Sequence, residues 1–189
     1  MSENKLNIRK EKIKLRKNLS ENEVAALSLK ICRRILESDE YKKAEKLLIY
    51  NAANGEADLA AVAEAAARDG KMIAYPLCLE NRQMTALVPA DDSAFVRGAF
   101  GIMEPDINRS RELAPEELDL VICPLTAFDE ECRRIGMGGG YYDRYIPRCG
   151  NAVIAAAAYE MQKVGEVPVE ENDVLVDIVF TESDVYRRS

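Results

Sequence analysis

The first twenty residues place polar and apolar side chains with the period of a helix. On a wheel at 100° per residue, four basic side chains fall within about one sixth of a turn. Ile8, Leu15 and Leu19 share a separate apolar face. The pattern predicts a first helix with a cationic stripe. Three interpretations of the stripe are open: a solvated helix face, a DNA-binding arm or a local anion site. The stripe consists of Lys5, Arg9, Lys12 and Arg16.

A capping box begins a second predicted helix. Residues 20–23 read Ser-Glu-Asn-Glu, so the Ser20 hydroxyl can accept a hydrogen bond from the Glu23 amide while the Glu23 carboxylate accepts one in return. We expect this helix to run to about Glu37, which gives a helical N-terminal segment over about residues 3–37.

Short apolar strands and helices alternate in the rest of the chain. Residues 46–50 and 72–75 are predicted strands, and between them Asp58 can begin a helix that Gly70 ends. Strand, helix and strand in this order predict a βαβ unit with a parallel pair. The buried face of its helix is predicted to hold Leu59, Val62, Ala63 and Ala66.

Four further strands are predicted at residues 84–88, 119–123, 152–158 and 174–180. The whole pattern predicts an α/β fold of three layers, α/β/α, with a mostly parallel central sheet and helices on both of its faces. The chain shows no internal repeat and no Pro/Ser-rich linker. We therefore expect a single domain over residues 1–189, with the helical segment packed on the α/β core.

Composition excludes several classes of protein. With 189 residues and 48% apolar side chains, a single domain should bury roughly 70% of its unfolded surface, which rules out disorder. No stretch reaches the roughly 18 to 20 apolar residues of a membrane helix, and the N-terminus lacks the apolar region of a signal peptide. Five cysteines without a CxxC pair encode neither a disulfide framework nor a structural zinc site. We expect a cytoplasmic protein with reduced thiols and no membrane partner.

The absence of histidine restricts the chemistry further. Ser-His-Asp triads, Cys-His dyads, histidine bases and histidine metal ligands are all excluded. Charge is unevenly distributed, because residues 1–18 hold seven bases and two acids in a chain whose net charge is −7. The remainder therefore carries −12, and so acidic a body disfavours nucleic acid as a partner.

A glycine-rich segment follows the predicted strand 119–123 and Pro124. Four glycines occur in the five positions 136–140, where the backbone can adopt positive φ and its amides can approach a bound group, with Arg134 supplying charge. The segment matches neither the Walker A spacing nor GxGxxG, since Tyr141 takes the place of the last glycine. From spacing alone, a flexible turn and a phosphate cradle both remain open.

The run from Phe128 to Arg144, FDEECRRIGMGGGYYDR, resembles the signature of the 5-formyltetrahydrofolate cyclo-ligase family. The resemblance extends over nearly the whole chain. It implies a fold similar to the ribose-phosphate isomerase and CoA-transferase group, and conversion of 5-formyltetrahydrofolate and ATP to 5,10-methenyltetrahydrofolate, ADP and phosphate with magnesium. The other matching positions are Lys5, Arg9, residues 50–56, Tyr75-Pro76, residues 101–105, Val167-Pro168-Val169, Asp173 and Asp177.

The implied mechanism suits a chain without histidine. The family is thought to phosphorylate the formyl oxygen with the γ-phosphoryl group of ATP, after which nitrogen 10 attacks the activated carbon and phosphate leaves. Phosphoryl transfer depends on positioning and charge neutralisation, so no catalytic nucleophile on the protein is expected.

The resemblance also implies roles for individual residues. Two aspartates, Asp143 and Asp177, would hold magnesium, which prefers a few carboxylates together with water and phosphate oxygens. Asn51 and Glu56 would contact the folate, together with Met137, Gly138, Gly139, Gly140 and Tyr141. The residues implied for ATP are Lys5, Arg9, Arg134, Gly136, Met137, Gly138, Gly139, Gly140, Tyr141 and Tyr142.

Some positions depart from the family pattern, and some have plainer interpretations. The family often has glycine at the positions of Leu125 and Cys132, and some members have bases at those of Met137 and Gly139. Asp177 is alternatively a solvent-facing strand residue and Asp143 a first-turn acid. Asp129 and Glu104 are interpreted as structural turn acids.

Three functions follow, in order of support. The first is the cyclo-ligase reaction, with 5-formyltetrahydrofolate, with or without a polyglutamate tail, and ATP as partners. The second is a folate- or nucleotide-binding protein of the same fold without turnover. The third is a nucleic-acid-binding module, which the acidic remainder of the chain disfavours.

Overall fold

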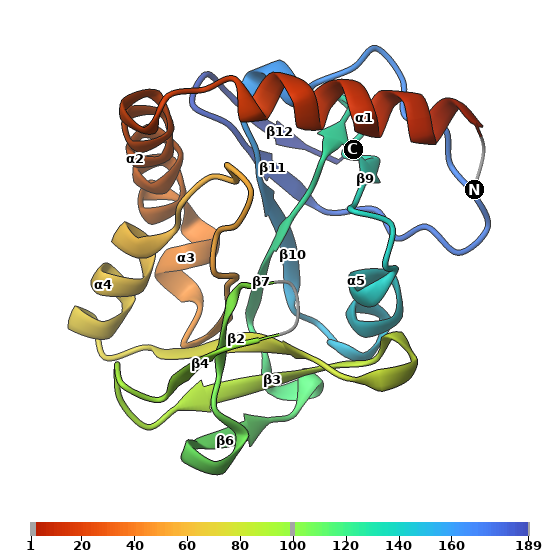
Figure 1. Ribbon diagram of the computed structural model, residues 1–189. Helices are drawn as coiled ribbons and strands as arrows, with labels where there is room; N and C mark the ends of the chain where they lie inside the picture. The colour runs from red at the N-terminus through yellow and green to blue at the C-terminus, as the bar shows by residue number, and fades with distance from the viewer. Residues whose placement is uncertain (1–2, 99–100, 189) are drawn as a thin grey trace.

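The computed structural model describes residues 3–98 and 101–188, and within them a central sheet has the strand order β12-β11-β10-β7-β1-β2-β3-β6 (Figure 1). Five neighbouring strands are parallel: β1 (Lys46–Leu48), β2 (Met72–Cys78), β7 (Leu120–Pro124), β10 (Val153–Ala157) and β11 (Ile178–Phe180). The edges pair antiparallel through β3 (Met84–Pro89), β6 (Ser110–Leu113) and β12 (Val185–Arg187).

Helices lie on both faces of this sheet, as Figure 1 shows. One face carries α2 (Glu21–Glu37), α3 (Asp39–Lys43) and α4 (Ala60–Arg68), and the other carries the short α5 (Tyr141–Tyr145). Helix α1 (Glu3–Lys17) crosses one end of the sheet. The predicted three-layer α/β/α fold with a mostly parallel sheet is confirmed.

Alternate residues of each central strand enter two different cores. Leu47 and Ile122 pack with α2 and α4, whereas Leu48 and Val121 pack on the opposite face with Tyr145 of α5. Parallel strands that are covered on both faces must be apolar at every position. This requirement explains why the predicted strands are continuous apolar runs rather than alternating ones.

Local signals set the helix boundaries. The Glu23 amide donates to the Ser20 hydroxyl at 3.3 Å and the Ser20 amide donates to the Glu23 carboxylate at 2.9 Å, so the predicted capping box is present. Helix α2 ends at Glu37, as expected. Ahead of α4, the Asp58 carboxylate accepts a hydrogen bond from the Ala60 amide at 2.9 Å.

The direction of the chain through the sheet reverses between β1 and β7. From β1 the chain passes through α4 to β2, its neighbour on one side, whereas β7 lies on the other side of β1 and leads away to β10 and β11. The loops that follow β1 and β7 therefore separate at the carboxyl ends of these strands. Open α/β sheets bind ligands in the crevice outside such a switch point.

The strand predicted at 174–180 is shorter than expected. Only Ile178–Phe180 pairs in the sheet, because the amides of Val174 and Val176 donate instead to Asp143 Oδ1 at 3.4 Å and to the Cys132 carbonyl at 3.2 Å. Two small hairpins have no counterpart among the predicted strands. They are β4 (Phe95–Arg97) with β5 (Met103–Pro105), and β8 (Ala127–Phe128) with β9 (Arg134–Ile135).

Short 3-10 turns complete the structure: η1 (Glu80–Arg82), η2 (Ile107–Arg109), η3 (Pro115–Glu117), η4 (Ile146–Arg148) and η5 (Glu160–Gln162). Among the helices of residues 3–98 and 101–188, none combines the length and the apolar character needed to cross a bilayer.

Candidate active site

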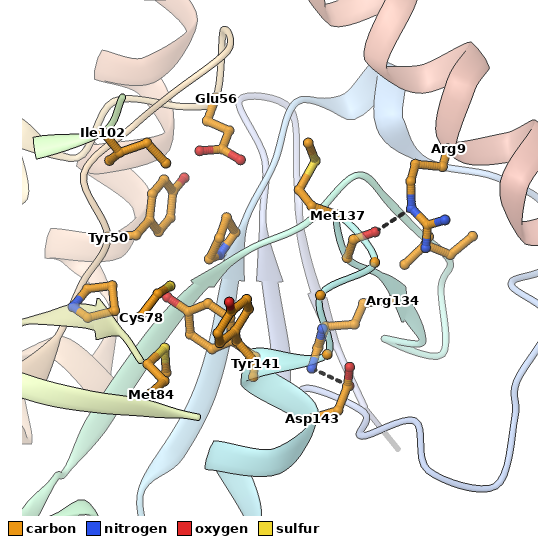
Figure 2. Close-up of a pocket in the computed structure, with 18 of the residues that line it drawn as sticks. Arg9, Tyr50, Glu56, Cys78, Met84, Ile102, Arg134, Met137, Tyr141 and Asp143 are labelled. Atoms are coloured by element: carbon orange, nitrogen blue, oxygen red, sulfur yellow. Dashed lines mark hydrogen bonds and ion pairs between the residues drawn. The ribbon is translucent and has the colours of Figure 1, made fainter. Parts of the chain in front are cut away.

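A cavity of about 320 Å³ lies beyond the carboxyl ends of β1 and β7. Figure 2 shows that its two ends differ in chemistry. At the cationic end, defined by Lys5, Arg9 and Arg134, basic side chains face the cavity. At the carboxylate end, Glu56 and Tyr50 face it from the loop after β1. Between the two lie the glycine segment 136–140 and α5, and the remaining walls include Pro76, Cys78, Met84, Ile102 and Pro124.

The cationic stripe of α1 faces the protein rather than solvent. Lys5 is 5% exposed and Arg16 is 1% exposed, whereas Leu15 of the predicted apolar face is 40% exposed. The solvated-face interpretation is therefore wrong, and polar contacts attach this helix to the rest of the molecule. They join Lys5 to Asp173, Arg9 Nε to the Gly136 carbonyl (2.7 Å), Lys12 Nζ to the carbonyls of Met161 (2.9 Å) and Lys163 (3.0 Å), and Arg16 Nε to the Asn54 carbonyl (3.2 Å).

Acidic side chains neutralise the cationic end from its border. Lys5 forms ion pairs with Asp173 and, at 4.0 Å, with Glu170. Burial lowers the pKa of the Arg9 guanidinium from its usual range, and the Glu170 carboxylate partly opposes this shift. Arginine nevertheless stays charged. A bound anion can therefore replace acceptors that these cations already use.

Arg134 is a second buried cation of this end. It extends from β9, is buried, and donates from Nη2 to Asp143 Oδ1 at 2.7 Å (Figure 2). Its Nε has no hydrogen-bond partner among the described residues, and neither has the buried hydroxyl of Tyr142. Buried polar atoms in native proteins nearly always have partners. Two unpartnered groups of residues lining one cavity indicate that a polar ligand completes this site.

The glycine segment forms the wall between the two ends. Gly138 has a φ of +102° and Gly140 a φ of +68°, which side chains rarely allow. A Cβ atom at Gly138 would lie 3.6 Å from the guanidinium carbon of Arg9. The segment is therefore an ordered part of the cavity wall, where its backbone lies within reach of the same ligand as Arg9.

Two carboxylates line the cavity away from the basic side chains: the mostly buried Glu56 and the buried Glu104 of β5. Glu56 accepts a hydrogen bond from the Ala53 amide at 3.1 Å, and its Oε1 lies 3.7 Å from Nη2 of Arg16. Burial raises the pKa of Glu56, while Arg16 and the Ala53 amide oppose that shift. Asn51 also lines the cavity and donates from Nδ2 to the Met103 carbonyl at 2.7 Å. A carboxylate between apolar and aromatic walls suits a flat ring system with N–H donors.

The structure does not bring the two predicted magnesium ligands together. Asp143 lines the cavity, but Asp177 is not among its lining residues. Asp177 accepts from the Ile154 amide at 2.9 Å and from Arg188 at 2.6 Å. Within the described ranges there is also no cluster of three or more acidic or thiol side chains that could hold a metal. A shared Asp143–Asp177 site therefore remains a prediction.

The other predicted site residues all line the cavity. They meet there from distant parts of the chain: Lys5, Arg9, Asn51, Glu56, Arg134, the glycine segment, Tyr141 and Tyr142.

The structural role predicted for Asp129 agrees with its contacts. Asp129 is buried and accepts hydrogen bonds from the Glu131 and Arg133 amides (3.1 Å each) and from the Val167 amide (2.8 Å).

Sequence reasoning missed two features of the site. Glu170 and Asp173 border the cationic end, although Asp173 was named only as a matching position of the resemblance and no spacing signal links either acid to Lys5. Arg16 stands behind Glu56 and does not itself line the cavity. Its place on the stripe, seven residues after Arg9, was the available signal.

The fold and the cavity define an α/β protein whose switch-point pocket joins an anion-binding end to a carboxylate-lined, partly apolar end. The family model described as the 5-formyltetrahydrofolate cyclo-ligase family matches residues 1–182, and the chain belongs to this family.

Individual relatives agree with this assignment. The chain is 30% identical to 5-formyltetrahydrofolate cyclo-ligase of Haemophilus influenzae over 91% of this chain and 95% of that protein. It is similar to the solved structure of 5,10-methenyltetrahydrofolate synthetase from Aquifex aeolicus, with a TM-score of 0.85, 33% identity, and coverage of 97% of this chain and 92% of that one. The synthetase structure from Mycoplasma pneumoniae shares the fold at 21% identity, with a TM-score of 0.77 and coverage of 94% and 98%.

Proposed function

We propose that this chain is an ATP-dependent ligase that converts 5-formyltetrahydrofolate to 5,10-methenyltetrahydrofolate, with release of ADP and phosphate. The observation that supports this most directly is a single cavity in which a cationic end and a carboxylate end lie close together. Such a cavity can hold a polyphosphate beside a heterocycle with N–H donors, as the reaction requires.

In this proposal the ATP phosphates occupy the cationic end. Lys5, Arg9 and Arg134 provide positive charge from two separate parts of the chain, and the backbone of residues 136–140 forms the adjoining wall toward the other end. Preorganised cations stabilise the charge that spreads over a transferring phosphoryl group. The cavity-facing Tyr141 and Tyr142 extend this wall toward the other end.

The folate occupies the carboxylate end. Glu56 and Asn51 accept and donate hydrogen bonds at the edge of the pterin ring, since a carboxylate accepts from two adjacent N–H groups. The apolar and sulfur-containing walls, including Cys78 and Met84, pack on the ring faces. The formyl group then lies in the middle of the cavity, facing the γ-phosphate.

The chemistry needs no nucleophile from the protein. The formyl oxygen forms a bond to the γ-phosphorus as the bond to ADP breaks, which gives a phosphorylated formyl group. Nitrogen 10 then attacks the formyl carbon and loses its proton, and the phosphate leaves with the former formyl oxygen. This sequence proceeds through positioning and charge stabilisation, which the described residues supply.

Magnesium fits this site in part. Asp143 offers one carboxylate in the cavity, and magnesium is usually held through one or two carboxylates together with substrate phosphates. When bound, it neutralises phosphate charge. Asp143 would give up its ion pair with Arg134 on binding, which frees this guanidinium for the phosphates. The geometry gives no support to a direct role for Asp177.

A coupled assay tests the proposal. The purified chain, mixed with 5-formyltetrahydrofolate, ATP and magnesium, should form the methenyl chromophore and one ADP per product. With an oxygen-18 label in the formyl group, the label should appear in the released phosphate. Binding of both ligands without turnover would identify a non-catalytic binding protein instead. The cytoplasmic location and the use of polyglutamylated substrate stay predictions.

A further inference from the structure

Arg16 is a buried cation behind the carboxylate end of the cavity. It belongs to the last turn of α1, and its side chain is 1% exposed. Nε donates to the Asn54 carbonyl at 3.2 Å and Nη1 to the Leu125 carbonyl at 3.4 Å. Arg16 thereby joins three segments: helix α1, the loop after β1 that carries Glu56, and the end of β7.

The remaining nitrogen of this guanidinium faces Glu56. Nη2 lies 3.7 Å from Glu56 Oε1 and has no hydrogen-bond partner among the described residues. Glu56 is itself held by the Ala53 amide on its other oxygen. The Arg16 contact therefore sets the direction of the carboxylate from behind, while its cavity side stays available.

Charge decides what this carboxylate can recognise. Arg16 from α1, Tyr50 after β1 and Tyr142 from α5 act on Glu56, and Glu104 of β5 is a second carboxylate that lines the same cavity. Burial raises the pKa of both phenols well above the usual value, so both are neutral at neutral pH. Arg16 is thus the cation that opposes the effect of burial on Glu56.

We propose that Arg16 is a positioning residue that keeps Glu56 ionised and directed into the cavity, so that this end accepts a ligand edge with two adjacent N–H donors. A protonated Glu56 would offer an O–H donor toward those N–H groups and would lose one acceptor. The identity of the ligand as a folate rests on the proposed function. The positioning role itself rests on the contacts of Arg16.

A purely structural role for Arg16 makes different predictions. A clamp between α1 and its neighbours would affect both substrates alike, without dependence on pH or on Glu56. A positioning role acts through Glu56 alone, on the folate side, and its effect depends on the protonation of that carboxylate.

The experiment compares Arg16→Gln, Arg16→Lys, Glu56→Gln and the double variant, with Lys17→Gln as a control for the loss of an exposed cation on the same helical turn. KM for 5-formyltetrahydrofolate and for ATP are measured from pH 6 to 9, together with thermal melting. Arg16→Gln should raise the folate KM about tenfold at pH 7 and leave the ATP KM within about twofold. The folate effect should shrink as the pH rises, because Glu56 then ionises without help.

Two further comparisons isolate the pair. Arg16→Lys keeps the positive charge and should restore most of the folate affinity. In the Glu56→Gln background, Arg16→Gln should add less than about twofold, because the two residues act as one unit. The double variant should also melt above Arg16→Gln, since a single substitution leaves a buried charge uncompensated. This melting comparison still reports on the pair if Arg16→Gln is too unstable for kinetics.

Carboxyl carbon NMR separates this inference from the proposed function. With labelled glutamate, and with Glu56→Gln to assign the signal, Glu56 should titrate at higher pH in the Arg16 variant than in the parent, whether or not turnover occurs. Any of four results would overturn the positioning role. Arg16→Gln could raise the folate KM and the ATP KM equally, or raise the folate KM by the same factor at every pH. Its effect on the folate KM could simply multiply with that of Glu56→Gln, or the titration of Glu56 could be unchanged in the Arg16 variant. Absence of turnover in the parent, with the titration shift present, would overturn only the proposed function.

Discussion

The two ends of the cavity use the same kinds of charge in opposite order. At the cationic end, Lys5 and Arg134 face the cavity and carboxylates pair with them from its border. At the carboxylate end, Glu56 faces the cavity and a cation, Arg16, supports it from behind. In the proposed function, the charge that faces the cavity complements the ligand, and the opposite charge pairs with it from the border or from behind.

One helix contributes to both arrangements. Lys5 and Arg9 of α1 reach the cationic end and Arg16 reaches the carboxylate end. Lys5 and Arg16 are eleven steps apart along the helix, so their backbones are separated by roughly 16 Å. Because α1 docks by charged contacts more than by an apolar face, the contacts that attach it to the body also build the site.

The largest expected effect comes from breaking the pairing of charges at the cationic end. Asp143→Asn removes the partner of Arg134 and the carboxylate proposed for magnesium. Turnover should fall about 100-fold and the magnesium concentration for half-maximal rate should rise. Initial rates over a magnesium series measure both, with Asp92→Asn as a control for an exposed aspartate.

An unchanged magnesium dependence in Asp143→Asn would mean that Asp143 serves only to hold Arg134. The same series on Asp177→Asn decides whether a second carboxylate takes part. An equal change there would mean that Asp177 reaches the metal when ligands are bound, although it does not line the cavity in this structure.

The second effect tests the carboxylate end. Glu56→Gln keeps the shape but removes the charge, and a charge-assisted hydrogen bond contributes about 1.5 to 3 kcal/mol. KM for 5-formyltetrahydrofolate should rise more than tenfold while KM for ATP stays within about twofold. Steady-state kinetics with Glu64→Gln, an exposed glutamate of α4, provide the matched control.

Acidification should imitate this substitution. Burial raises the pKa of Glu56, so the carboxylate form is lost as the pH falls through that raised pKa. Folate binding should therefore weaken in the parent as the pH falls, whereas Glu56→Gln should lack this dependence. A parent whose folate KM is flat between pH 5 and 8 would contradict the role of the charge.

These contrasts also show what the sequence could predict. The capping box at Ser20 and the unit around α4 rest on signals within a few residues, and both formed as expected. The direction of the α1 stripe depends on contacts 109 and 168 residues away, from Arg16 to Leu125 and from Lys5 to Asp173. A wheel shows that a stripe exists but not which acceptors fold against it.

The candidate site shows the same difference between signals within a few residues and contacts that depend on the fold. The glycine segment was visible because four glycines are unusual wherever they fold. The pairing of Arg134 with Asp143 required the turn between them, whose path depends on positive φ at Gly138 and Gly140. The strand predicted at 174–180 was too long because its apolar residues pack on irregular backbone beside Asp143 and Cys132.

The third effect compares bases of one helix. Arg9 faces the cavity, whereas Lys14 is exposed on another face of α1. Arg9→Ala should raise the ATP KM about tenfold or more, because a charged contact to phosphate contributes about 1.5 to 3 kcal/mol, whereas Lys14→Ala should change it by less than about 1 kcal/mol. The ATP dependence of the cyclisation rate measures the contrast, and melting curves show whether both variants fold. Equal small effects would leave the glycine segment and Arg134 as the phosphate site.

The smallest effect concerns the carboxylates that border the cationic end. Glu170 lies 4.0 Å from Lys5, is partly exposed and lines the cavity, where its charge opposes that of an incoming phosphate. Glu170→Gln should therefore lower the ATP KM by about twofold to threefold, because an exposed charge at this distance contributes less than about 1 kcal/mol. The folate KM should not change, since Glu170 belongs to the opposite end.

A salt series makes this test more specific. The difference in ATP KM between parent and Glu170→Gln should shrink as ionic strength rises from about 0.01 to 0.15 M. The control is Glu166→Gln. Glu166 is an exposed glutamate four residues before Glu170, and it pairs with Arg133 rather than with Lys5. A raised ATP KM in Glu170→Gln would instead show that this carboxylate orients Lys5 for the phosphate, and the cationic end would then depend on its border acids as the carboxylate end depends on Arg16.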